Sequence, residues 1–286
     1  AGAGKYVVEA AYSIAKMKRA GNEGDWKTWL SSTVSAWDSL RARNGSEAQK
    51  PPYVDYAAEA AFTLLDDEIT TKFDLASKHT YPATVPEILG DAKTGKKGKY
   101  QLNAEEAQKW DLRLENEIIK KYESLEWVPA AFARQGAIFD TLRSGLYNTV
   151  KVKLFNAQGE RLLNTMRNSG RDDLMNQADQ LEDAAKDFWK QKKQQELDGA
   201  DEIMVRRYGT SVAYARKYSV KNAAITKAIG RLAYYTDIIG DAKMQQTDEH
   251  ARPDDEGRDE AHVQTRPGLT ALPAAQGNAT PLPASP

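Results

Sequence analysis

The residue types that most often carry chemistry are scarce in this chain. It holds no cysteine and three histidines, His79, His250 and His262. Thiol nucleophiles, disulfides and thiolate zinc sites are therefore excluded. A Ser/His/Asp triad or a histidine-based metal site would have to use His79, because the other two histidines lie near the C-terminal end. We expect His79 to be a surface histidine, and we expect no metal and no cofactor.

Acidic residues are the next candidates. Adjacent pairs such as Asp172 and Asp173 do not converge on one substrate atom, because neighbouring helical side chains point about 100° apart. These two acids favour the start of a helix instead. Glu123 is the acid that we keep as a candidate catalytic residue, since envelope lytic transglycosylases can be α-solenoids with a single catalytic glutamate. The neighbouring Lys120 and Lys121 favour an exposed acid on a helix, and the Gly-Leu-Met-Gln-type stretch of those enzymes is missing.

One glycine-rich segment matches part of a phosphate-binding motif. Residues Gly90 to Lys97 fit the pattern GxxxxGK, but a lysine follows where a serine or threonine must hold magnesium. No strand is expected before it, so the strand-to-helix junction that cradles a triphosphate is missing. The segment is better interpreted as a solvated loop.

Composition limits the classes of function. The chain has 286 residues with a net charge of −1, which argues against nucleic-acid binding. No apolar run approaches the 18 to 20 residues of a membrane-spanning helix, so no transmembrane segment is expected. Residues 245–286 contain no aromatic residue, six of the eleven prolines and an acidic patch, which predicts a disordered tail. Because the chain begins with Ala1, we expect a processed or excised product without its targeting segment.

Residues 1–244 have a helical period and are predicted to form one all-α domain. A long loop over residues 77–103, with one helical turn near Pro86 to Leu89, interrupts the helices. Asp25 is expected to cap the second helix, and Asn44-Gly45 to end it in a left-handed conformation. Residues 150–154 are expected to be extended, and no sheet is predicted. The helices are expected near residues 6–20, 25–44, 53–73, 104–125, 128–145, 159–167, 171–197, 200–218 and 223–240.

A repeat is the most informative pattern. The segment from Tyr6 to Tyr12 matches the segment from Tyr56 to Phe62, with small alanines before an aromatic residue on one helical face, at a period of fifty. A third, looser copy begins near Trp127. Helix hairpins of this kind cannot bury their apolar face alone, so they stack into a solenoid. An unrelated helical bundle is the alternative, since short hairpins fit both.

Aromatic and basic residues supply the candidate partner-binding surface. Trp26, Trp29 and Trp37 share one helical face, and tryptophan is enriched at interface hot spots. Core packing between repeats is the alternative for most of the six tryptophans. The basic C-terminal helices are the second candidate surface, which could dock an acidic peptide or be a solvated face. Its candidate residues are Arg206, Arg207 and Arg231.

The helical pairs resemble divergent tetratricopeptide repeats, in which small residues and an aromatic recur at the spacing of Ala58, Phe62 and Leu65. The period of fifty and the insertion after Phe73 depart from that family. About two thirds of the chain resembles the C-terminal region of the tetratricopeptide-repeat component of the myxobacterial adventurous-gliding motility machinery. The segments that carry this resemblance are 127–136, 169–174, 202–208 and 236–244. Members of that family carry further repeats upstream.

The resemblance implies a periplasmic scaffold in a multi-protein envelope complex, and association with the outer membrane is part of this expectation. We therefore expect a non-catalytic, irregular tetratricopeptide-like α-solenoid that binds other protein subunits of a motility complex. The competing expectation is an envelope lytic transglycosylase-like enzyme that uses Glu123.

Overall fold

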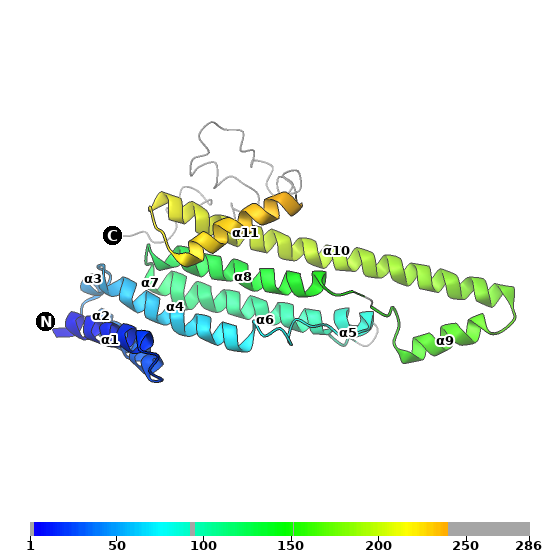
Figure 1. Cartoon of the computed structure of the whole chain (residues 1–286), viewed down its shortest axis with the longest axis horizontal. Helices are drawn as coiled ribbons and strands as arrows, with labels where there is room; N and C mark the ends of the chain where they lie inside the picture. The colour runs from blue at the N-terminus through cyan, green and yellow to red at the C-terminus, as the bar shows by residue number, and fades with distance from the viewer. Residues whose placement is uncertain (1–2, 92–94, 151, 240–286) are drawn as a thin grey trace, which may run out of the picture. The chain divides into compact units, whose positions relative to one another are not determined.

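The computed structural model describes residues 3–91, 95–150 and 152–239 of the chain. This part is all-α, as the sequence predicts: it contains no β-strand, and its extended pairings are two isolated bridges, Thr84 with Lys153 and Asp91 with Lys96. Residues 245–286, for which we predict a disordered tail, lie outside the described residues. The helices, labelled in Figure 1, are α1 (Ala3–Ala20), α2 (Trp26–Arg43), α3 (Gly45–Ala48), α4 (Tyr53–Lys72), α5 (Val85–Leu89), α6 (Lys99–Leu114), the π-helix η1 (Glu115–Ile119), α7 (Lys120–Tyr122), α8 (Trp127–Tyr147), α9 (Ala157–Arg167), α10 (Asp172–Lys217) and α11 (Ala223–Ile239).

The described residues form two compact units. The first holds residues 3–72, 110–138 and 202–239, and the second holds residues 73–91, 95–109, 139–150 and 152–201. Helices α6, α8 and α10 each contribute residues to both units. The sequence predicts a single helical domain over residues 1–244, and this stays a prediction.

In the first unit, α1, α2 and α4 pack against one another. Ala15 of α1, Leu30 of α2 and Ala60 of α4 form one buried cluster, on which Trp26, Trp29, Val34 and Leu64 pack. Small residues at the crossing points let the three helix axes approach closely, and the larger rings close the space around them. Farther along, Trp37 of α2 contacts the ring of Tyr122 of α7, with the ring centroids 4.7 Å apart. These contacts fix α1 and α2 on α4.

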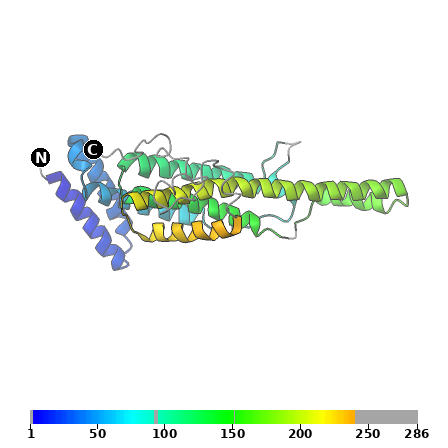
Figure 2. The ribbon, with the colours of Figure 1, turned by 90° about the horizontal axis from the view of Figure 1, so that it is seen from above.

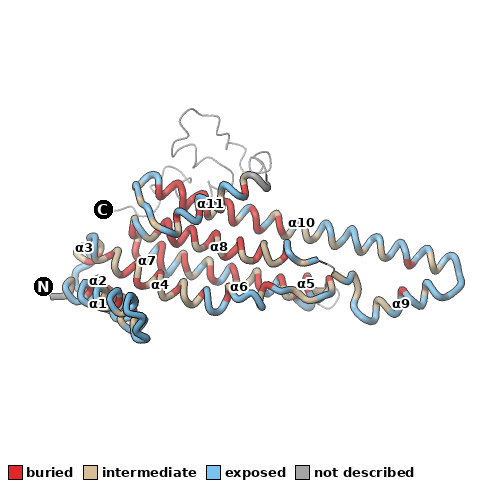
Figure 3. The backbone as a smooth tube through the Cα atoms, in the orientation of Figure 1, coloured by how far each residue is buried: buried red, intermediate tan, exposed pale blue. Residues whose placement is uncertain are grey.

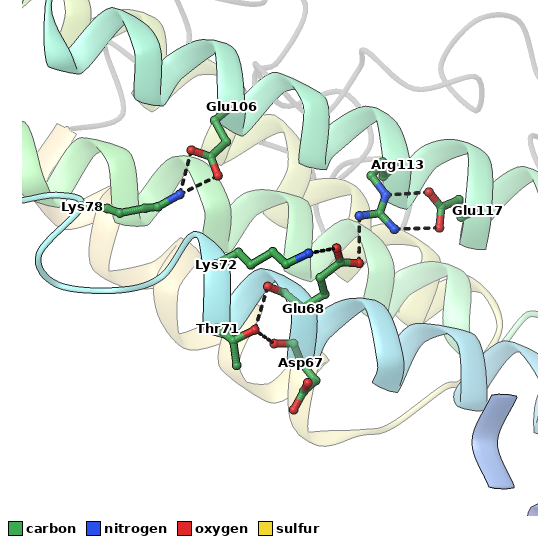
Figure 4. Close-up of polar contacts among 8 residues, drawn as sticks. All are labelled: Asp67, Glu68, Thr71, Lys72, Lys78, Glu106, Arg113 and Glu117. Carbon is green, nitrogen blue, oxygen red and sulfur yellow. Dashed lines mark hydrogen bonds and ion pairs between the residues drawn. The ribbon is translucent and has the colours of Figure 1, made fainter. Parts of the chain in front are cut away.

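Charged side chains tie α4 to α6 at the edge of the first unit. The Arg113 guanidinium contacts Glu117 on its own chain segment at 2.6 Å and Glu68 of α4 at 2.9 Å. Glu68 also accepts a hydrogen bond from Lys72. Figure 4 shows this chain of ion pairs along the helices. Such exposed pairs contribute little stability individually.

The α6–η1–α7 segment replaces the predicted continuous helix over residues 104–125. It begins earlier, at Lys99, and passes through a π turn at Glu115–Ile119 before it ends at Tyr122. Ile118 and Ile119 in the π turn are fully buried. The predicted loop over residues 77–103 is accordingly shorter than expected, and the predicted helical turn near Pro86 is α5.

The second unit has a smaller core, which includes Phe73, Ile88, Tyr100 and Leu146. Arg143 of α8 and Asp201 of α10 form a buried ion pair at 2.5 Å. In this unit α9 and the first part of α10 are mostly exposed, as the pale blue tube in Figure 3 shows. Arg167 at the end of α9 contacts Asp179 of α10 at 3.0 Å and also pairs with Glu182.

Two predictions of helix ends are wrong. The break expected between residues 197 and 200 does not occur, because α10 continues from Asp172 to Lys217, as Figure 2 shows. One glycine inside a helix, here Gly199, costs only about 1 kcal/mol, which the burial of Leu197 and Ala200 offsets. Asn44 does not end α2 in a left-handed conformation: its φ is −152°, and its side chain accepts a hydrogen bond from the Glu47 amide at the start of α3.

Candidate docking groove on the first two helices

An open apolar groove of about 350 Å³ lies along α1 and α2 in the first unit. Tyr6 and Val7 in its wall are 61% and 54% exposed, which is unusual for large apolar side chains that lie side by side. Contiguous exposed apolar surface of this kind marks a binding site more often than an isolated exposed residue does. The lining residues are Tyr6, Val7, Ala10, Ala11 and Ile14 of α1, and Trp29 and Ser32 of α2.

The groove exists because α1 is apolar on two faces. Val8 and Ala15 point into the first unit and are buried, whereas Tyr6, Val7 and Ala10 continue the apolar surface around the helix to the outside. A helix on the surface of a globular unit usually carries one apolar stripe. The second stripe on α1 therefore has no covering element among the described residues.

The three candidate tryptophans differ in what they offer. Trp37 is fully buried, and its Nε1–H donates a hydrogen bond of 2.8 Å to the Ala48 carbonyl oxygen. Core packing is thus the correct interpretation for Trp37, which offers no surface to a partner. Trp26 is half-buried, and the Arg19 guanidinium lies 5.2 Å from its ring. Of the three, Trp29 alone lines the groove.

Asp25 occupies the N-cap position of α2, as predicted, but its side chain does not cap the helix. Asp25 makes no side-chain hydrogen bond to the backbone at the start of α2. Its carboxylate instead contacts the Lys18 ammonium at 2.9 Å and accepts a hydrogen bond of 3.3 Å from Trp29 Nε1. Lys18 lowers the pKa of Asp25 below its ordinary value. The contact holds the indole of Trp29 at the groove wall.

The three candidate arginines do not line the groove, and two of them have identified partners within the chain. Arg207 forms an ion pair of 2.7 Å with Asp111, and both side chains are 17% exposed. Burial raises the pKa of Asp111 above its ordinary value, although Arg207 beside it acts in the opposite direction. The Arg231 guanidinium lies 4.8 Å from the Tyr234 ring and donates a hydrogen bond of 2.9 Å to the Tyr235 hydroxyl.

Arg206 is half-buried, and burial lowers its pKa. With Arg207 buried against Asp111 and Arg231 placed on two aromatic rings, the three guanidinium groups do not form the open basic face that would dock an acidic peptide. The sequence pattern predicts that all three residues are helical, and they lie on α10 and α11, but it does not predict their partners within the chain.

Glu123 lies in a different pocket, of about 580 Å³, in the first unit. It is half-buried and ends α7 in a left-handed conformation with φ of 54°, so the prediction of an exposed acid on a helix is wrong. Asp55 and Glu126 line the same pocket, and burial raises the pKa of each. Ser124 donates a hydrogen bond of 2.6 Å to Asp55.

His79 is buried in the second unit, 8% exposed, which corrects the prediction of a surface histidine. Its Nε2 lies 2.8 Å from the Phe73 carbonyl oxygen, and its Nδ1 is buried without a hydrogen-bond partner in the described residues. Burial lowers the pKa of this ring. Within the described residues, no three histidine or acidic side chains are grouped as metal ligands.

The GxxxxGK segment lies between α5 and α6, with residues 92–94 outside the described residues. The Asp91 amide donates a hydrogen bond of 2.9 Å to the Lys96 carbonyl oxygen, and Lys97 pairs with Glu105 of α6. A helix rather than a strand precedes the segment, as expected for a loop that is not a phosphate-binding loop.

The sequence does not predict the groove, because the repeat gives α1 and α4 similar apolar residues. Adding fifty to the residue numbers of the groove on α1 gives Tyr56, Ala57, Ala60, Ala61 and Leu64 on α4, a face that is covered in the structure. The comparison of equivalent positions therefore distinguishes a covered copy from an uncovered one.

In the described part of the chain, no helix has both the length and the apolar character needed to span a membrane. Comparison of the chain with protein-family models, with curated protein sequences and with solved structures gave no match.

Proposed function

We propose that this chain is a non-catalytic scaffold that binds other protein subunits through the groove on α1 and α2. The observation that carries the proposal is the exposed apolar surface of Tyr6, Val7 and Ala10 beside Trp29. Helix-in-groove recognition uses apolar surface of this shape, with side chains spaced by one helical turn. No cofactor and no metal enter the proposed role.

The proposed architecture is an irregular tetratricopeptide-like solenoid. Its support is the repeat of fifty residues, which makes α1 and α4 equivalent helices, and the antiparallel hairpin of α1 and α2 that packs on α4. In a stacked array each hairpin buries the apolar face of the next one. The second apolar stripe of α1 is the face on which a further helix would stack in such an array.

We further propose that the scaffold is a periplasmic component of a gliding-motility or envelope complex. The sequence resemblance over residues 127–136, 169–174, 202–208 and 236–244 supports this placement. The proposed partners are the other protein subunits of that complex, with association to the outer membrane through them. Nucleic acid is not a proposed partner, because a net charge of −1 lacks the excess of basic residues that is typical of nucleic-acid binders.

The alternative role as a lytic enzyme that uses Glu123 has weaker support. A single catalytic glutamate needs an apolar, enclosed setting that keeps it protonated. The pocket of Glu123 is open and also holds the carboxyl groups of Asp55 and Glu126. Measurement of muropeptide release from purified peptidoglycan by the chain and by Glu123→Gln tests this alternative: release that disappears in the variant would establish it.

Capture from envelope extracts tests the scaffold. The immobilised chain, the variant Ala10→Arg and the variant Ala42→Arg are compared by mass spectrometry of what each retains. Ala10 lines the groove, and Ala42 is an exposed alanine on α2 outside it, so both substitutions place the same charged side chain on a helix surface. We expect the chain and Ala42→Arg to retain envelope proteins that Ala10→Arg does not retain. Equal retention by all three forms would refute the groove as the binding surface.

A further inference from the structure

The face of α4 that is equivalent to the groove on α1 is covered by α1 itself. On α4, the ring of Tyr12 from α1 stacks on Tyr56, with centroids 4.3 Å apart and the ring planes at 15°. The Tyr12 hydroxyl donates a hydrogen bond of 2.5 Å to Glu59, and the Lys16 ammonium donates one of 2.6 Å to the same carboxylate. Ala15, between these two residues, packs on Ala60 in the buried cluster.

The same receiving residues recur on α1 without that cover. Subtracting fifty from Tyr56, Glu59 and Ala60 gives a tyrosine, a glutamate and an alanine, namely Tyr6, Glu9 and Ala10. On α4 the alanine is fully buried and the other two are half-buried, whereas all three are exposed on α1. The receiving face is thus present twice, once occupied and once open.

We infer that the groove on α1 binds a helix of a partner polypeptide that carries a tyrosine, a small residue and a lysine at the spacing of Tyr12, Ala15 and Lys16. This inference rests on the proposed scaffold function and names its ligand. The partner's aromatic ring stacks on Tyr6, its small residue packs on Ala10, and its hydroxyl and ammonium groups donate hydrogen bonds to Glu9. Charge-assisted bonds to a carboxylate are stronger than neutral ones and fix the register of the bound helix.

No second copy of this pattern occurs in the 286 residues. An aromatic residue followed by a small residue at the third position and a basic residue at the fourth occurs once in the 286 residues, at Tyr12, and that copy is bound to α4. Residues 245–286 contain no aromatic residue and carry an acidic patch, which Glu9 would repel. A second copy of the chain would have to release α1 from α4 before it could dock.

A peptide with the sequence of α1, residues 3–20, is the probe, because this helix binds the equivalent face of α4. With acetylated and amidated ends and a fluorescent label, it is titrated against the full chain, and binding is followed by anisotropy. Isolated helices of this length are marginally stable, so part of the binding free energy orders the peptide, and we expect a Kd on the order of micromolar. Glu9→Lys and Ala10→Arg should each weaken binding about tenfold or more, whereas Ala42→Arg should not.

A charge exchange makes the test specific for Glu9. The peptide with Lys16→Glu should bind the unaltered chain weakly and should regain affinity for the chain with Glu9→Lys. Absence of binding, or binding that Glu9 and Ala10 variants do not change, would overturn the inference. If Glu59→Gln changes the affinity for the peptide and the Glu9 variant does not, the peptide displaces the chain's own α1. This result would also overturn the inference. So would a dimer, seen by analytical ultracentrifugation, that Ala10→Arg dissociates.

The peptide titration tests the inferred ligand and the extract capture tests the proposed function, so either result can be negative without the other. If Ala10→Arg abolishes capture of envelope proteins while the peptide does not bind, the scaffold function stands and the inferred ligand is wrong. If capture does not depend on Ala10, the proposed function fails, whatever the peptide does.

Discussion

Tyr12 and Tyr56, which lie on helices that repeat one another, stack with their ring centroids 4.3 Å apart. Tyr12 is half-buried, and burial together with its hydrogen bond to Glu59 raises the pKa of its hydroxyl well above the ordinary value. The neutral phenol is therefore a permanent hydrogen-bond donor in the folded chain. One side chain joins the stacked rings to the carboxylate of Glu59, and through that carboxylate to Lys16.

Tyr12→Phe keeps the stacked ring and removes the hydroxyl, so its effect isolates the hydrogen bond. We expect the free energy of unfolding to fall by about 1.5–3 kcal/mol, the range for a hydrogen bond to a charged group. Chemical denaturation followed by circular dichroism measures it. Tyr6→Phe is the matched control, because the Tyr6 ring is exposed, and it should change stability by less than about 0.5 kcal/mol. Equal losses in both variants would contradict the role of the Glu59 contact.

Alanine substitutions of Trp37 and Trp29 should have different effects on the free energy of unfolding and on peptide binding. Trp37→Ala removes a fully buried ring and its hydrogen bond to Ala48, and should lower the free energy of unfolding by about 3–5 kcal/mol. Trp29→Ala removes a half-buried ring that lines the groove and should cost about 1–2 kcal/mol, since less apolar area is lost. Binding of the α1 peptide should weaken in Trp29→Ala. A Trp29 variant with full peptide affinity would remove this residue from the docking surface.

The Arg207 and Asp111 pair gives a double-mutant test of a buried charge. Arg207→Met leaves the carboxylate of Asp111 buried without its partner and should cost about 3–5 kcal/mol. The double variant Asp111→Leu with Arg207→Met should recover most of this loss, because two apolar side chains of similar size need no desolvation of charge. Thermal denaturation of the single and double variants measures the coupling. Additive losses would show that the two side chains do not act as a pair.

The burial of His79 should make the stability of the second unit sensitive to acid. Burial lowers the folded-state pKa of His79, so the folded chain binds this proton less readily than the unfolded chain does. The stability that the neutral ring contributes is present above about pH 6.5, the unfolded value, and is lost as the pH falls below it toward the folded pKa. Stability should drop between pH 7.5 and 5.5 by at most about 1.4 kcal/mol per pH unit.

The variant His79→Gln is the control for this pH dependence. Glutamine can donate a hydrogen bond to the Phe73 carbonyl oxygen and does not titrate, so the stability of the variant should vary less over the same interval. The Asp74, Lys78 and Glu106 charges that influence His79 remain in the variant. An unchanged pH dependence would show that His79 is not the source of the acid sensitivity.

The sequence predicts the all-α class and most helices because their apolar periods are strong, as in α1 and α4. It does not predict which apolar stripe of α1 is covered, since Val7 and Val8 are the same residue type and only packing distinguishes the exposed one from the buried one. The burial of His79 and the ion pair of Arg207 with Asp111 are also invisible to local patterns. The ion pair joins α10 to α6, and α8 packs against His79 at Gly145, and a helical period does not report contacts of this kind.

The π turn at Glu115–Ile119 holds one residue more than an α-helical turn, and it lies between two tertiary contacts. On one side Arg113 contacts Glu68, and on the other Tyr122 contacts Trp37. An ordinary α-turn of the same sequence would rotate everything beyond it by about 100° and move Tyr122 away from Trp37. A chain shorter by a single residue in this turn could close into a regular helix with both contacts intact, so this is the place in the first unit where a change of length is absorbed without a change of partners.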